Sequence, residues 1–194
     1  MENSSVMKNN GTLLSIGIDV GSVNGAISVV DENLKIHLLT KTPTYQVEIK
    51  SKRNKSKINK ETMKYERDYR KRTCVNFREM RNVFLPFITN KIIYTIEKIA
   101  ARPGEGEPNS FMNGNSLGNF QGLYAFLNPI EYYEPLPITW KREMGVDSDK
   151  EKSIKLAEDI FQVSLRDFLP KGKVDDIAEA LLLSFYGLKM YYNK

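Results

Sequence analysis

The segment KIIYTIEKIA, residues 91–100, is a nearly continuous apolar run. Such a run is typical of a central β-strand that other elements cover on both faces. A carboxylate, Glu97, follows directly after Ile96. Burying an ionised carboxylate without partners costs several kcal/mol. Glu97 therefore marks either the point where the strand has already reached solvent or a site that uses the carboxylate.

The pattern around this strand predicts an α/β fold. Residues 13–19 and 25–30 are rich in β-formers and predict a hairpin, and a third strand is expected within 33–42. Another short strand is expected at 136–139. Helices are predicted over about 60–89, from near Gly114 to Leu127, and over 147–161 and 174–190. This order of elements builds a mixed sheet flanked by helices.

Length and composition limit the class of protein. The 194 residues fit one domain, expected over 13–194 after a short, polar and flexible tail at 1–12. No stretch approaches the roughly 20 apolar residues of a membrane span, so no membrane partner is expected. The single cysteine, Cys74, excludes an internal disulfide and a cysteine-based zinc site, which favours a reducing, cytoplasmic compartment.

Basic residues are concentrated in one part of the chain. The formal net charge is +5, but residues 41–82 alone contain 14 basic and 5 acidic residues, so the remainder is net acidic. A basic arm on an acidic body indicates a polyanionic partner, although a solvated lysine-rich loop has the same composition. At a predicted turn, four side chains are candidates for phosphate contacts: Lys52, Arg53, Lys55 and Lys57. Residues 45–58 are expected to extend the third strand into a basic turn with a return, and residues 60–82 are expected to form an added DNA-binding helix, so that about 41–82 is a basic hairpin or helix region.

Acidic residues outside this arm lie where strands and helices begin or end. Asp19 ends the first predicted strand, where it is either a turn residue or a ligand. The last predicted helix opens with Asp175, Asp176 and Glu179, which fit either a capping-box pattern or a pair of site acids. Asp176 and Glu179 lie about 60° apart around a helix, beside its apolar face.

These acids can meet Glu97 at one end of the sheet. Carboxylates packed together repel one another and raise each other's pKa, and divalent cations relieve that repulsion. Oxygen-rich sites without Cys or His select hard ions, Mg²⁺ first and Mn²⁺ as a substitute. Two such ions can activate a water for phosphodiester cleavage. The only histidine, His37, is expected to be an ordinary strand residue.

Four segments in this order resemble the RuvC-type Holliday junction resolvases, and most closely the compact RuvC-like endonucleases of bacteriophages: IGIDVGSVNGAISVVD, IYTIEKIAARPGEGEPNSFMNGNSLGNFQGLYAFL, ITWKREMGV and KVDDIAEALLLSFYG. The resemblance covers most of residues 13–190. It implies an RNase H-like fold with a mixed five-stranded sheet, a homodimer, and Mg²⁺-dependent symmetric nicking of branched DNA. For a viral protein, the compartment would be the cytoplasm of the host cell.

The resemblance also implies roles for individual residues. Asp19, Glu97, Asp176 and Glu179 resemble the family's metal ligands, with Asp175 as the alternate to Asp176. The segment RPGEGEPNSF, which begins at Arg102, resembles the part that enters the junction. Phe111 is the candidate for stacking on bases there, and a buried anchor is the alternative. Lys141 and Arg142 resemble a basic pair near the cut. The stripe Leu117, Phe120, Tyr124 and Leu127 resembles the dimer-forming face, and intramolecular core is the alternative.

The leading hypothesis is a Mg²⁺-dependent structure-selective DNA endonuclease that acts most plausibly on four-way junctions. A second hypothesis is a catalytically weak module of the same fold that holds branched DNA without cutting it. A phosphotransferase of the actin and sugar-kinase type also begins its phosphate loop with Asp-x-Gly. That class needs a second related lobe, and 194 residues are too few for it.

Overall fold

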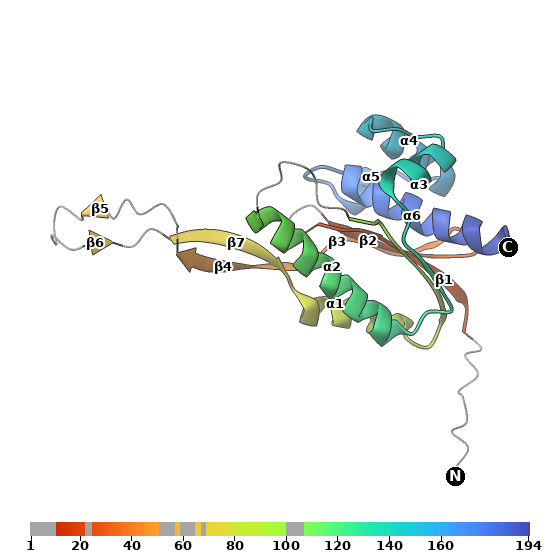
Figure 1. The fold of residues 1–194 in the computed structure, drawn as a ribbon. Coiled ribbons are helices and arrows are strands. Elements are labelled where there is room, and N and C mark those ends of the chain that lie inside the picture. The colour runs from red at the N-terminus through yellow and green to blue at the C-terminus, as the bar shows by residue number, and fades with distance from the viewer. Residues whose placement is uncertain (1–10, 22–24, 51–56, 59–64, 67–68, 100–106) are drawn as a thin grey trace, which may run out of the picture.

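A five-stranded mixed sheet forms the centre of the protein in a computed structural model that describes residues 11–21, 25–50, 57–58, 65–66, 69–99 and 107–194 (Figure 1). The strand order is β3-β2-β1-β8-β9. The strands are β1 (Leu13–Asp19), β2 (Ala26–Asp31), β3 (Ile36–Lys41), β8 (Lys91–Ile96) and β9 (Glu131–Tyr133). Strands β1, β2 and β3 pair antiparallel, whereas β8 and β9 run parallel to β1. The predicted hairpin and mixed sheet are confirmed.

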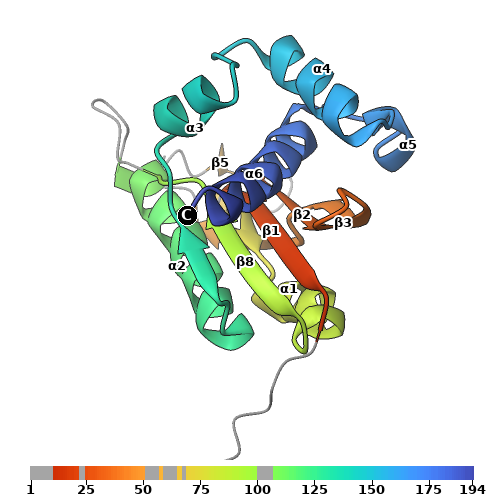
Figure 2. The same ribbon diagram turned by 90° about the vertical axis from the view of Figure 1, so that its right-hand side faces the viewer.

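Helices cover both faces of this sheet (Figures 1 and 2). One face carries α3 (Pro137–Glu143), α4 (Lys150–Phe161), α5 (Leu165–Phe168) and α6 (Asp175–Tyr192). The other carries α1 (Phe77–Phe84), the short 3-10 helix η1 (Leu85–Phe87) and α2 (Glu107–Leu127). The arrangement creates two apolar cores, one on each side of the sheet. Among the described residues, none of the helices has the length and apolar character needed to cross a membrane.

Strand β8 contributes to both cores, as its apolar sequence predicts. Ile92, Tyr94 and Ile96 are buried in the core beneath α1 and α2, whereas Ile93 is buried in the core beneath α6. Successive side chains of a strand point to opposite faces, so a nearly continuous apolar run suits this place. The prediction of a central strand is confirmed.

The first strand lies unusually close to α6. A Cβ atom added to Gly17 would lie 2.1 Å from the Ala180 carbonyl oxygen, so only glycine permits this approach. Ser28 Oγ donates to that same carbonyl across 2.7 Å, and Ser15 Oγ donates to the Ser184 carbonyl across 2.7 Å. These contacts hold the first half of α6 over β1.

The basic arm is a long hairpin, one of the two forms predicted for about 41–82. Strand β4 (Thr44–Lys50) pairs antiparallel with β7 (Tyr69–Val75), and the short strands β5 (Lys57–Ile58) and β6 (Tyr65–Glu66) pair beyond them. The prediction of a helix over 60–82 is wrong for β6 and β7, and α1 begins only at Phe77. Seven cross-strand pairs with β4 outweigh the weak helix propensity of this segment, because local propensity yields to tertiary pairing.

Two predicted boundaries also need correction. Helix α2 begins at Glu107, seven residues before the predicted start near Gly114, so its first turns contain the Gly-, Asn- and Ser-rich stretch that predicted a loop. The strand predicted at 136–139 is the start of α3, where Pro137 occupies the first helical position. The parallel edge strand is instead β9, which ends at Tyr133.

Candidate active site

The ends of β1 and β8 place two carboxylates at one edge of the sheet. Asp19 is the last residue of β1, and Glu97 is the first residue after β8. The two strands are parallel with Ile18 paired to Ile96, and the Glu97 N–H donates to the Ile18 carbonyl across 3.1 Å. The backbone register therefore holds Asp19 and Glu97 beside each other.

Helix α6 brings further acids to this edge. Because its first half packs over β1, the first two turns carry Asp176 and Glu179 toward the ends of β1 and β8. Asp176 forms an ion pair with Lys41, the last residue of β3. The helix is capped at Val174 without a side-chain hydrogen bond, so the capping-box alternative for Asp176 and Glu179 is wrong.

The electrostatics of Asp19 show that the acids lie close together. Burial is the largest cause that raises the pKa of the Asp19 carboxyl well above its ordinary value. Three negative charges raise it further: those of Glu97, Glu179 and Asp176. The positive charge of Lys141 acts in the opposite direction. The charges of acids from β8 and α6 thus act on the carboxyl at the end of β1, and a shared metal site for these acids stays a prediction.

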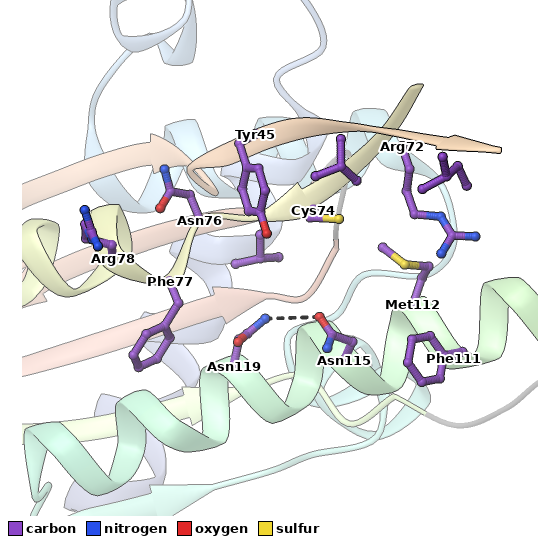
Figure 3. Close-up of a pocket in the computed structure, with 13 residues that line it drawn as sticks. Tyr45, Arg72, Cys74, Asn76, Phe77, Arg78, Phe111, Met112, Asn115 and Asn119 are labelled. Carbon is purple, nitrogen blue, oxygen red and sulfur yellow. Dashed lines mark hydrogen bonds between the residues drawn. The ribbon is translucent and has the colours of Figure 1, made fainter. Parts of the chain in front are cut away.

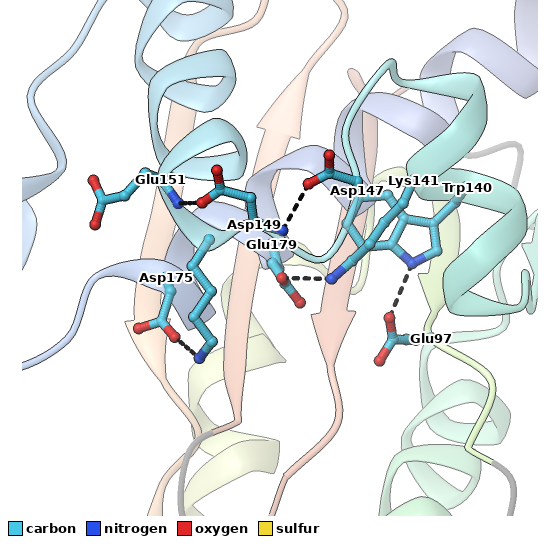
Figure 4. A network of polar contacts seen from close by, with 9 residues as sticks. Glu97, Trp140, Lys141, Asp147, Asp149, Glu151, Asp175 and Glu179 are labelled. Carbon is cyan, nitrogen blue, oxygen red and sulfur yellow. Dashed lines mark hydrogen bonds and ion pairs between the residues drawn. The ribbon is translucent and has the colours of Figure 1, made fainter.

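Helix α3 covers the cluster and supplies two of its partners (Figure 4). The fully buried Trp140 donates from its indole Nε1 to Glu97 Oε1 across 2.9 Å. The neighbouring Lys141 forms an ion pair of 2.7 Å with Glu179, and its Nζ lies 5.2 Å from the Trp140 ring centroid. Glu97 therefore does not mark a strand that has reached solvent, because it is only partly exposed and is bound by α3.

Asp175 is held separately from the cluster. It is 5% exposed and forms an ion pair with Lys150 at the start of α4. Burial opposes ionisation of Asp175, but the hydrogen bond and charge of Lys150 together bring its pKa below the ordinary value. Asp175 is also not among the charges that raise the pKa of Asp19. This arrangement favours Asp176 over Asp175 as a partner of Asp19.

The donor set suits a hard divalent cation, since Asp19 and the three acids that act on it all offer carboxylate oxygens. Within the described parts of the chain, however, no three acidic, histidine or cysteine side chains are arranged as a metal-binding group. The acids are instead engaged by Lys41, Lys141 and Trp140. An ammonium group and a metal ion compete for the same carboxylate oxygens. A bound ion would therefore have to displace Lys41 from Asp176 and Lys141 from Glu179.

The other predicted DNA contacts have mixed outcomes. Lys52, Arg53, Lys55 and Arg102 lie outside the described residues, and Lys57 lies in β5 with an undescribed side chain. Phe111 is 69% exposed on α2, so the alternative of a buried anchor is wrong, and it belongs to a helix rather than a loop. Arg142 is exposed, whereas Lys141 contacts the acid cluster directly.

The predicted dimer stripe is divided between the core and the surface. Phe120 is fully buried and Leu127 is 4% exposed, both in the core between α2 and the sheet. These two side chains have no surface to offer a second copy, so the dimer role predicted for them is wrong and the core alternative holds. Leu117 is only partly buried and Tyr124 is 40% exposed. A role for this pair in a dimer stays a prediction.

Sequence reasoning missed the partners of the acids. Lys41, Lys150 and Trp140 were not predicted as site residues, because each reaches its acid from a distant part of the chain. The one available signal was Trp140, the single tryptophan of the chain, directly before Lys141. His37 lies in β3 as predicted, and its Nε2 bonds Asp31 across 2.9 Å.

The chain was compared with known proteins by sequence and by structure. No family model matches the sequence, and no curated protein matches it. Among solved structures, the chain is similar to "T. thermophilus RuvC in complex with Holliday junction substrate", with a TM-score of 0.55, 14% identity, and coverage of 93% of this chain and 94% of that one. A second match, "Thermus thermophilus RuvC structure", has a TM-score of 0.51, 12% identity, and coverage of 93% and 96%. The fold is therefore RNase H-like and of the RuvC type.

Proposed function

We propose that this protein is a Mg²⁺-dependent, structure-selective endonuclease that cleaves phosphodiester bonds at branched DNA, most plausibly at four-way junctions. The observation that carries the proposal is the cluster at the end of β1. There the charges of Glu97, Glu179 and Asp176 all act on Asp19. Four acids at one edge of the sheet repel one another, which lowers the stability of the fold. Their placement there therefore indicates a function rather than a structural role.

The metal ligands in this proposal are Asp19, Glu97, Asp176 and Glu179. Two Mg²⁺ ions bound there, or Mn²⁺ in their place, would supply an activated water and neutralise charge at the cleaved phosphate. Trp140 orients the Glu97 carboxylate by its 2.9 Å hydrogen bond. Lys41 and Lys141 neutralise Asp176 and Glu179 until an ion takes their place. Lys141, once released from Glu179, is positioned to contact a DNA phosphate.

The similarity in fold supports the proposed substrate. One structural neighbour is a RuvC in complex with a Holliday junction substrate, and the similarity extends over nearly the whole of both chains. By analogy, the proposal places branched DNA over the acid cluster and the basic hairpin of β4 and β7, and it assigns a homodimer to the active form. It also includes a single nuclease domain over 13–194, a relationship to the compact phage enzymes and a cytoplasmic location, in the host cell if the protein is viral.

A cleavage assay with binding controls tests the proposal. The wild-type protein should nick a labelled four-way junction in Mg²⁺ and should leave it intact in EDTA. Asp19→Asn and Glu97→Gln should abolish nicking and still shift the junction in a gel, because each keeps the shape of the side chain and removes its charge. Nicking at the wild-type rate by either variant would contradict the assignment of the site.

A second candidate function is a module that holds branched DNA without cutting it. The ion pairs of Asp176 and Glu179 favour it, since these acids already have cationic partners in the fold. In the same gel assay with Mg²⁺, such a module would give a shifted wild-type band and no cleavage product at any enzyme concentration. The two functions are therefore separated by one experiment.

A further inference from the structure

A groove of about 780 Å³ lies between the hairpin of β4 and β7, the start of α1 and the first half of α2 (Figure 3). Its volume is within the range of small-molecule and cofactor sites, about 300–1,000 Å³. None of the acids of the proposed active site lines it. The groove is thus a separate feature whose chemistry can be considered alone.

The hairpin presents two different faces to its surroundings. Tyr45, Val47 and Ile49 alternate along β4 and line the groove, together with Arg72 and Cys74 from the facing positions of β7. Gln46, Glu48 and Lys71, at intervening positions of the two strands, do not line it. The hairpin therefore directs an aromatic, aliphatic and arginine face toward α2.

Helix α2 forms the opposite wall. Phe111, Met112, Asn115 and Asn119 line the groove along successive turns of the helix. Asn119 Nδ2 donates to Asn115 Oδ1 across 3.3 Å. That bond uses one of the two amide hydrogens of Asn119 and one lone pair of Asn115, so both amides can still bond a ligand. Amides of this kind pair with the edges of bases.

The groove combines exposed rings with positive charge. Phe111 is 69% exposed and Tyr45 is 49% exposed, on opposite walls. Among the described residues of its lining, Arg72 and Arg78 carry charge and none is acidic. Aromatic rings beside arginines are the chemistry with which proteins hold unpaired nucleotides, where each stacked base contributes about 1–3 kcal/mol.

We propose that this groove binds an unpaired nucleotide of branched DNA, with the base stacked on Tyr45 and its phosphate contacted by Arg72. The inference rests on the proposed function, because it names the part of the substrate that the protein distinguishes from ordinary duplex. A branch point exposes unpaired or unstacked nucleotides, and a continuous duplex does not. The groove would thereby provide selectivity for structure without reading sequence.

Binding in EDTA tests the groove without any cleavage. The probes are a duplex with a short single-stranded gap of thymidines and the same duplex fully paired. Tyr45→Ala and Arg72→Gln should each weaken binding to the gapped duplex about tenfold, the loss expected for one stacked base, and should leave the paired duplex unaffected. Gln46→Ala is the matched control, since this uncharged neighbour lies on β4 but outside the groove. Equal loss for both probes, or no loss for either, would overturn the proposal.

Cys74 offers a second and independent measurement. It lines the groove and is the only cysteine of the chain, so the rate of alkylation measures the accessibility of the groove alone. Gapped duplex at ten times its dissociation constant should slow the alkylation of Cys74 about tenfold, and paired duplex should not. Unchanged alkylation with saturating gapped duplex would overturn the proposal. Unfolding midpoints of the variants, measured in parallel, identify any loss of binding that comes from misfolding.

The two proposals fail in different ways. A wild-type protein that prefers gapped duplex in EDTA but never nicks a junction in Mg²⁺ would remove the nuclease function and keep the groove. A protein that nicks junctions but binds gapped and paired duplex equally would support the nuclease function and overturn the proposal for the groove. The groove would then bind another class of ligand.

Discussion

Trp140 Nε1 donates a hydrogen bond to Glu97 Oε1 across 2.9 Å and so joins α3 to the end of β8. The indole is fully buried, whereas the carboxylate is partly exposed at the edge of the sheet. The bond orients Glu97, the site acid that directly follows the apolar sequence of β8.

Trp140→Phe should lower the free energy of unfolding by about 2 kcal/mol, the usual contribution of a hydrogen bond to a charged group. Urea unfolding in EDTA measures this loss. Glu97→Gln is the matched control, because the amide oxygen still accepts from the indole and the repulsion between Glu97 and Asp19 is removed, so this variant should not lose stability. Equal stability of Trp140→Phe and wild type would show that the bond does not hold α3 against the sheet.

Asp19→Asn should stabilise the fold at neutral pH without divalent ions. Burial and three neighbouring acids raise the folded-state pKa of Asp19 above its unfolded value. Its contribution to stability is therefore complete below about pH 4 and is lost as the pH rises through the folded pKa, at about 1.4 kcal/mol for each unit of the shift. Asparagine cannot ionise and avoids this loss.

Urea unfolding of Asp19→Asn and wild type at about pH 4 and pH 7.5 checks the sign of this effect. The variant should have the larger free energy of unfolding at pH 7.5, and the difference should shrink at pH 4. A variant that is less stable than wild type at pH 7.5 in EDTA would mean that the Asp19 charge is not repelled by its neighbours.

Lys41→Met should make the protein more dependent on divalent ions for its stability. The substitution removes the partner of Asp176, so we expect a loss of about 1 kcal/mol in EDTA and a larger gain on adding Mg²⁺ than wild type shows. Thermal unfolding with and without Mg²⁺ measures both quantities. Lys152→Met is the control, because its pair with Asp147 is more than half exposed on both sides and lies on α4. The same response in both variants would argue against competition between Lys41 and an ion.

Gly17→Ala should destabilise the fold by about 3 kcal/mol, since its Cβ would lie 2.1 Å from the Ala180 carbonyl oxygen and 2.4 Å from the Ser184 nitrogen. Chemical unfolding measures the loss. Gly118→Ala on α2 is the contrasting substitution: its Cβ would have nothing within 4 Å, and alanine should stabilise the helix by about 0.5–1 kcal/mol. Similar effects of both changes would contradict the close packing of β1 and α6.

The sheet and the position of the acids could be predicted from the sequence because their signals are local. The apolar run of β8 and the turn after β1 each have a recognisable pattern, and the parallel register of two strands brings Asp19 and Glu97 to one edge. The position of the acids of α6 could be predicted because this helix has a strong apolar face that must pack against the sheet. Periodicity and chain order were sufficient for these elements.

The extent of the hairpin and the partners of the acids could not be predicted in the same way. Strand β7 contains the helix formers Arg70, Lys71 and Arg72 among β-forming residues, and pairing with β4 along its length makes it a strand. The contacts of Lys41, Trp140 and Lys150 join residues that are 135, 43 and 25 positions from their acids. Such pairings depend on the assembled fold, and no local pattern in one sequence specifies them.

The central claim is that acids from β1, β8 and α6 act together on divalent ions, and a Mn²⁺ titration followed by electron paramagnetic resonance tests it most directly. The account predicts about two Mn²⁺ bound per chain, competition by Mg²⁺, and reduced binding after Asp19→Asn or Glu97→Gln, with Lys152→Met unchanged. Absence of saturable Mn²⁺ binding, or binding that both acid variants leave intact, would contradict the account.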